Sequence, residues 1–241
     1  MTTGLTYATA KTQIATLAVV EETNTAFLEI LPQAITYAEN RMCRDLDFLE
    51  FSDTATATMV AGTRSVSLAA GTFVVTEQAN IITPAGVTNP NSASATRNPC
   101  LPTTKEFLDA VYGSNTVANR GMPRYFVPFN DNTFLFGPVP DDAYTVEIVG
   151  MTRPASLSAG NTTTFISTYL PDLFIMAVMV YISGYQRNFG RQSDDPQMAV
   201  SYESQYQTLL KGASVEEARK KFTASAWTSE SPSPVATPTR G

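Results

Sequence analysis

Three pairs of adjacent carboxylates could do chemistry in this sequence: Glu21–Glu22, Asp141–Asp142 and Asp194–Asp195. Such pairs can bind a divalent metal ion, or serve as the acid and the base of a hydrolase. Each pair also has a structural explanation. The first lies where a predicted helix ends, the second suits a turn, and the third suits the cap of a helix. We therefore predict no catalytic residue and no metal site, and a small hydrolase is the least favoured hypothesis.

The remaining residue types also argue against an enzyme. The chain contains no histidine, which excludes Ser–His–Asp and Cys–His catalysis and every zinc site that needs an imidazole. No glycine pattern for cradling phosphates follows a predicted strand. Cys43 falls on the apolar side of a predicted helix, so we expect a buried free thiol there, with a disulfide to Cys100 as the alternative. We predict no cofactor.

Charge and hydropathy set further bounds. The chain has 241 residues, 22 of them acidic and 16 basic, for a net charge of −6. A protein whose main task is to grip nucleic acid needs clustered Lys and Arg instead. The longest apolar run, Leu173–Ile182, is about half the length that spans a bilayer, so we expect a core helix there and no membrane partner. No signal peptide is visible, which predicts a soluble protein made in a cytoplasm.

The elements that position these residues begin with four predicted helices, over residues 11–21, 24–49, 171–189 and 196–221. Pro32 either opens the second helix at its first turn or kinks a longer one. Apolar side chains recur every three or four residues in that helix and form one stripe: Leu28, Leu31, Ile35, Ala38, Met42, Leu46 and Leu49. Charged side chains lie mostly off the stripe, on a surface that faces solvent or another subunit: Glu39, Arg41, Arg44, Asp45 and Asp47.

The last predicted helix has its own cap and stripe. Asp194 or Asp195 caps it and Pro196 takes its first position. Its apolar stripe consists of Met198, Tyr202, Tyr206, Leu209 and Leu210.

Residues 52–154 follow a period of two and predict a β-rich insertion. A small antiparallel sheet is expected after Ser52. The long Pro/Asn/Ser segment 84–102 is a predicted loop, either functional or disordered. A short helix follows, capped by Thr103 or Thr104. A hairpin turning at Asn130–Asn132 and a third strand then predict a meander.

The predicted fold class is therefore α+β, with a bundle of about four helices, the inserted sheet and an extended tail. We expect a single domain over 1–222 and a tail over 223–241, because Ser, Thr, Pro and Ala cannot bury enough surface to offset the entropy of ordering. Trp227, the chain's one tryptophan, is either an anchor that folds on binding or simply an exposed side chain.

Three segments together resemble one protein family. They are "ILPQAITYAENRMCRDLDFLE", "PRYFVPFNDNTFLFGPVPDDAYTVEIVGMTRPASLS" and "TTTFISTYLPDLFIMAVMVYISGYQRNFGRQSDDPQMAVSYESQYQTLL". In this order they resemble the head-to-tail adaptors, or neck proteins, of tailed bacteriophages, especially podovirus-like particles.

The resemblance implies a structural role in the virion neck. Such adaptors form a homo-oligomeric ring, commonly of twelve copies, between the portal protein and the tail (nozzle or tube) proteins. DNA passes through the ring without specific binding. Their C-terminal segments typically reach onto the portal, which implies portal docking through Phe222, Trp227, Pro232, Pro234, Pro238 and Arg240.

A second hypothesis is a tail or baseplate component. In that case the Thr/Asn-rich loop would contact the host surface or other tail proteins.

Overall fold

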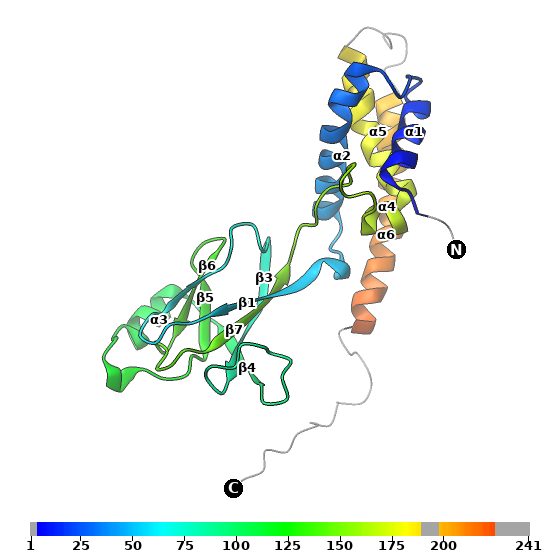
Figure 1. Cartoon of the computed structure of the whole chain (residues 1–241). Helices are drawn as coiled ribbons and strands as arrows, with labels where there is room; N and C mark the ends of the chain where they lie inside the picture. The colour runs from blue at the N-terminus through cyan, green and yellow to red at the C-terminus, as the bar shows by residue number, and fades with distance from the viewer. Residues whose placement is uncertain (1–3, 189–197, 225–241) are drawn as a thin grey trace. The chain divides into compact units, whose positions relative to one another are not determined.

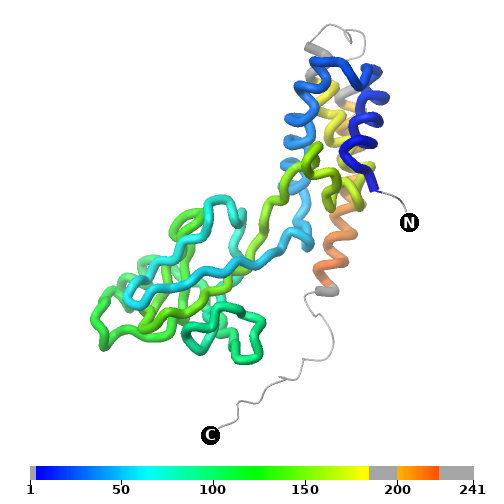
Figure 2. The backbone as a smooth tube through the Cα atoms, viewed as in Figure 1, coloured from blue at the N-terminus to red at the C-terminus, as the bar shows by residue number. Residues whose placement is uncertain are grey.

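A computed structural model describes residues 4–188 and 198–224 of the chain (Figure 1). Within these residues it has six α-helices and one seven-stranded sheet, which confirms the predicted α+β class. The chain divides into two compact units, a helical unit (Met1–Leu49 with Ala155–Gly241) and a β unit (Glu50–Pro154). Figure 2 shows the β unit as one continuous insertion in the chain of the helical unit. The sheet is larger than the small one that the sequence predicts.

The helical unit is built around one apolar helix. It contains α1 (Tyr7–Leu17), α2 (Thr25–Asp45), α4 (Phe165–Tyr169), α5 (Pro171–Asn188) and α6 (Met198–Ala224). Helix α5 contacts the other four, as its nearly continuous apolar run leads one to expect. Its buried apolar side chains are Leu173, Phe174, Ile175, Ala177, Val178, Met179 and Ile182.

The start of α1 and the end of α2 differ from the predicted bounds for local structural reasons. Helix α1 begins earlier than the predicted residue 11, because Thr6 and Thr9 form a reciprocal capping box. Helix α2 stops at Asp45 instead of residue 49, and the buried Leu46 after it has an extended backbone. Pro32 lies inside α2, so it does not open the helix.

The carboxyl group of Glu39 is buried, although the sequence predicts that it lies on an outer surface. Both of its oxygens accept the backbone N–H of Leu157, at 3.2 and 3.3 Å. This contact fastens the chain that returns from the β unit to α2. Burial raises the pKa of Glu39 above its ordinary value, although its hydrogen bonds favour the ionised form.

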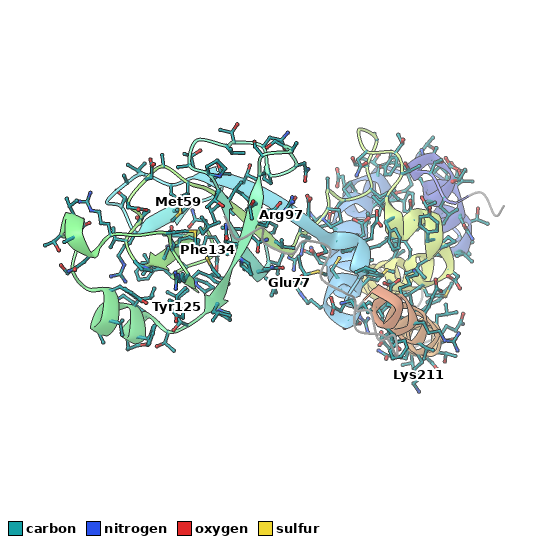
Figure 3. The ribbon with its side chains drawn as sticks, turned by 90° about the horizontal axis from the view of Figure 1, so that it is seen from below. Met59, Glu77, Arg97, Tyr125, Phe134 and Lys211 are labelled. Atoms are coloured by element: carbon teal, nitrogen blue, oxygen red, sulfur yellow. The ribbon has the colours of Figure 1, made fainter. Side chains whose placement is uncertain are left out.

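The β unit folds around one sheet with the strand order β1-β7-β3-β4-β5-β6-β2. The strands are β1 (Ser52–Thr58), β2 (Ser65–Ser67), β3 (Val75–Thr83), β4 (Thr96–Pro102), β5 (Tyr125–Pro128), β6 (Thr133–Gly137) and β7 (Thr145–Met151). All neighbours are antiparallel except β4 and β5. Met59 and Phe134, labelled in Figure 3, belong to the core on one face of this sheet. The other core residues are Val66, Phe73, Ala79, Ile81, Cys100, Phe126, Phe136, Val146 and Ile148.

The predicted meander is wrong in its third strand. Strands β5 and β6 form the expected hairpin, and the side chain of Asn130 accepts the N–H groups of Asn132 and Thr133 in its turn. Strand β7, however, pairs with β1 and β3 instead of β6. Both faces of β7 are buried, as Val146 on one and Glu147 on the other show, and such a strand belongs inside a sheet.

The predicted loop 84–102 is shorter in the structure, because its last seven residues form β4. Pro99 and Pro102 lack a backbone donor and argue against a strand in the sequence. Strand β4 nevertheless pairs with β3 from Thr96 to Cys100 and with β5 at Leu101 and Pro102. After it, Thr104 caps α3 (Lys105–Tyr112), one of the two predicted caps.

The buried carboxyl predicts a specific pH dependence. A raised pKa in the folded state means that Glu39 contributes stability below pH 4.5, the ordinary value, and loses it as the pH rises through the folded pKa. We expect the free energy of unfolding of the native chain, relative to that of Glu39→Gln, to be larger at pH 4.5 than at pH 7, so that the native chain is relatively more stable at the lower pH. Urea titrations of both proteins at the two pH values measure this difference, and a difference that does not change with pH contradicts the prediction.

Candidate assembly surfaces

Helix α6 carries the predicted docking segment. Phe222, in its last turn, is 60% exposed. The other predicted docking residues lie outside the described residues: Trp227, Pro232, Pro234, Pro238 and Arg240. The structure therefore describes the base of the segment, and the surface on which that base rests.

A polar cluster joins the first half of α6 to α2. The guanidinium of Arg41 donates two hydrogen bonds to the carboxylate of Glu203, at 2.7 and 2.6 Å, and lies 4.2 Å from the centre of the Tyr206 ring. The fully buried Tyr206 donates its hydroxyl proton to Asp45 at 2.7 Å. The hydrogen bonds from Arg41 lower the pKa of Glu203, and burial raises that of Tyr206. We call these four residues the α2–α6 cluster.

A second set of contacts holds the end of α6. The buried carboxylate of Glu217 accepts the amino group of Lys220 at 2.7 Å and, more weakly, the backbone N–H of Leu49 at 3.4 Å. Lys221 pairs with Asp47 just beyond α2. The Lys220 ammonium also lies 5.4 Å from the centre of the Phe165 ring. These contacts give the C-terminal segment a defined starting point within the helical unit.

An aromatic patch lies on the β unit. The rings of Phe107 and Tyr112 on α3 both contact Tyr125 on β5, with ring centres 5.3 and 5.9 Å from it (Figure 3). Leu101, the register partner of Tyr125, and Val111 are exposed beside them. Exposed aromatic and aliphatic side chains in one patch are typical of protein interfaces. The sequence prediction missed this patch, although Phe107 and Val111 lie one turn apart on a helix that buries Leu108 alone.

One ion pair fastens the loop that precedes β4. Arg97, labelled in Figure 3, donates to both oxygens of Glu147, at 2.8 and 3.0 Å, and to the side-chain oxygen of Asn91 in the loop at 2.7 Å. Asn80 donates a further hydrogen bond to Glu147 at 3.0 Å. Glu147 is buried, which by itself would raise its pKa, but the hydrogen bonds from Arg97 lower the pKa below its ordinary value. Three hydrogen bonds from one guanidinium, two to Glu147 and one to Asn91, thus join the sheet and the loop.

The acidic pairs form local contacts. Glu22 pairs with Lys11 at 3.3 Å. Asp141 accepts the hydroxyl of Tyr144, and Asp142 accepts the N–H of Ala143. The pair Asp194–Asp195, with its predicted cap and Pro196, lies outside the described residues. In the part of the chain that the structure covers, no three His, Cys, Asp or Glu side chains are grouped as metal ligands, and no helix is long and apolar enough to cross a membrane.

The two cysteines lie in different units and neither forms a disulfide. Cys43 is half-buried on α2, and Cys100 is buried on β4. Burial raises the pKa of Cys100 to about 12, so its thiol stays protonated near neutral pH.

The family of the chain is established by comparison with known protein families. A family model described as the SU10 adaptor protein matches residues 5–236. The chain belongs to the SU10 adaptor family. The resemblance to phage head-to-tail adaptors is therefore confirmed. SU10 adaptors are structural proteins of phage particles and not an enzyme family, which agrees with the sequence prediction. No curated protein matches this SU10 adaptor.

The α2–α6 cluster predicts the cost of losing its arginine. Arg41→Ala removes a forked hydrogen bond and a ring contact, so we expect the helical unit to lose about 1–2 kcal/mol of stability, since the pair is partly exposed. Arg44→Ala, at an exposed position on the same helix, is the matched control and should change stability by less than about 0.5 kcal/mol. Equal denaturant midpoints for the two variants would contradict the role of the cluster.

Proposed function

We propose that this SU10 adaptor forms a ring between the portal and the tail of a phage particle. The ring extends the DNA channel, and the C-terminal segment 223–241 docks on the portal. The family match carries the proposal, because it runs from residue 5 to residue 236 and includes both units and most of that segment. A ring of twelve copies is the arrangement that the resemblance favours.

The charge of the chain supports a channel wall. A net charge of −6 disfavours tight binding of a phosphate backbone, and DNA must slide through a channel without being held. The aromatic patch around Tyr125 supports a contact with another virion protein, because aromatic side chains grouped with exposed aliphatic ones are enriched at protein interfaces.

The attachment of α6 supports docking through the C-terminal segment. The Arg41–Glu203 contact holds the first half of α6, and the Lys221–Asp47 contact holds its end. The C-terminal segment therefore begins at a defined place on the helical unit. Phe222 is already exposed at this point, and Trp227 follows a few residues later. A large aromatic side chain that becomes buried at an interface contributes strongly to affinity. We assign Trp227 as the anchor.

Truncation after Phe222 tests the docking segment. The shortened chain should lose portal binding in a pull-down with purified portal, because the anchor and the prolines are gone. Its circular dichroism spectrum and melting temperature should stay close to those of the full chain, since the cut removes only the last two of the 27 residues of α6. Portal binding at full strength by the truncated chain would refute this assignment.

A single substitution tests the anchor. Trp227→Ala should weaken portal docking by about 2 kcal/mol or more if the ring is buried at the interface. Trp227→Phe keeps an aromatic ring and should lose less. Titration calorimetry of each variant with portal measures the affinities, and unchanged binding by Trp227→Ala would show that the tryptophan is simply exposed.

A further inference from the structure

Among the residues that the structure describes, none pairs with the outer edge of strand β1. This strand stands at the end of the strand order, with β7 on its other side. The carbonyl of Phe51 accepts the N–H of Thr152, and the N–H of Met59 donates to Tyr144, both at 2.8 Å. Backbone groups alternate along a strand, so the odd-numbered residues of β1 face β7 and the even-numbered residues face away. The outward groups belong to Ser52, Thr54, Thr56 and Thr58.

This edge lacks most of the features that usually block a sheet edge, and Asp53 is the exception. Strand β1 pairs with β7 over seven residues without a register shift, and it contains no proline or lysine. Its one charged residue is Asp53, whose carboxylate accepts the outward N–H of Thr54 at 2.7 Å. Strand β2, at the other end of the order, comes near β1 but forms no ladder with it. The edge can therefore accept an added strand.

The C-terminal segment has the sequence of an outermost strand. In "SPSPVATPT", Ser231–Thr239, all the prolines are even-numbered: Pro232, Pro234 and Pro238. In an extended chain their missing donors all lie on one edge, and the N–H groups of the odd-numbered residues lie on the other. Prolines occur in strands where the donor side faces solvent. One edge of this segment can pair with a sheet, and the other edge cannot be extended.

Charge complementarity gives the direction of pairing. If Thr56 faces Val235 in an antiparallel pair, Arg240 comes beside Glu50 and Asp53. At the opposite end Glu230 comes near Gly62, where the guanidinium of Arg120 lies. Parallel pairing would instead place Glu230 beside the two acidic side chains. Unlike charges at both ends therefore favour the antiparallel arrangement.

We propose that the β1 edge of one copy binds Ser231–Thr239 of a neighbouring copy as an added antiparallel strand. The choice of a neighbouring copy rests on the proposed ring, in which copies stand side by side. Ser225–Glu230 supply a connection of up to about 20 Å between α6 and the added strand. The portal competes for the same segment, so the strand exchange links copies before docking.

A proline added at one of two neighbouring positions tests the exchange in the absence of portal. Val235→Pro removes a donor from the pairing edge, so self-association measured by sedimentation velocity should weaken about tenfold or more. Ala236→Pro places the ring on the edge that already lacks donors and should leave self-association unchanged. A full chain that is monomeric at all concentrations, or equal weakening by the two variants, overturns the proposal.

Hydrogen exchange tests the other partner of the contact. The amides of Thr56 and Thr58 should be protected in the concentrated full chain, and should lose protection on dilution or in a chain truncated after Glu230. Protection that persists on dilution means pairing within one chain and overturns the exchange between copies. Trp227→Ala leaves Ser231–Thr239 intact, so its binding to portal tests the proposed function independently of the strand exchange.

Discussion

The helical unit depends on α5, against which α6 packs, and on the polar contacts that join α6 to α2. Among the side chains described for α6, only Tyr206, Ala213 and Glu217 are buried, and the helix packs against α5. Polar contacts join it to α2: Arg41 reaches Glu203, and Tyr206 reaches Asp45. The buried ring of Tyr206 donates a hydrogen bond to Asp45 and is covered by the guanidinium of Arg41. These contacts fix how far α6 is shifted along α2, because a shift of one turn would break them. The place where α6 ends, at Ala224, follows from these contacts.

The β unit depends on a different constraint: the backbone N–H and C=O groups of its one sheet need hydrogen-bond partners. Strand β7 meets this constraint inside the sheet, with β1 and β3 as partners and both of its faces buried. Strand β1 meets it on one side only. In the proposed ring, such an edge would be a means of association as well as a risk of aggregation. Prolines of one parity in the C-terminal segment would limit that association to a single added strand.

The sequence predicts the elements that periodicity specifies and misses those that distant contacts decide. The apolar run of α5 and the hairpin of β5 and β6 are visible because burial and turn chemistry are local. The partners of β7 are not, since Val146 and Ile148 fit an edge strand as well as a central one until the pairing is known. Glu39 and Arg41 are charged, as surface residues usually are, so the sequence places them on the surface. Only the fold shows that Glu39 accepts a hydrogen bond from Leu157 and that Arg41 donates to Glu203. The aromatic patch is missed for the same reason, because it combines residues of α3 with a residue of β5.

The central claim is that this SU10 adaptor is a joint between portal and tail, and imaging of the phage neck tests it most directly. Particles whose copies of this chain carry a compact N-terminal label can be reconstructed by electron cryo-microscopy. The account predicts a ring of labelled density directly below the portal, around the DNA axis, with extended density from each copy reaching the portal surface. Label at the distal end of the tail, with none at the neck, would contradict the account.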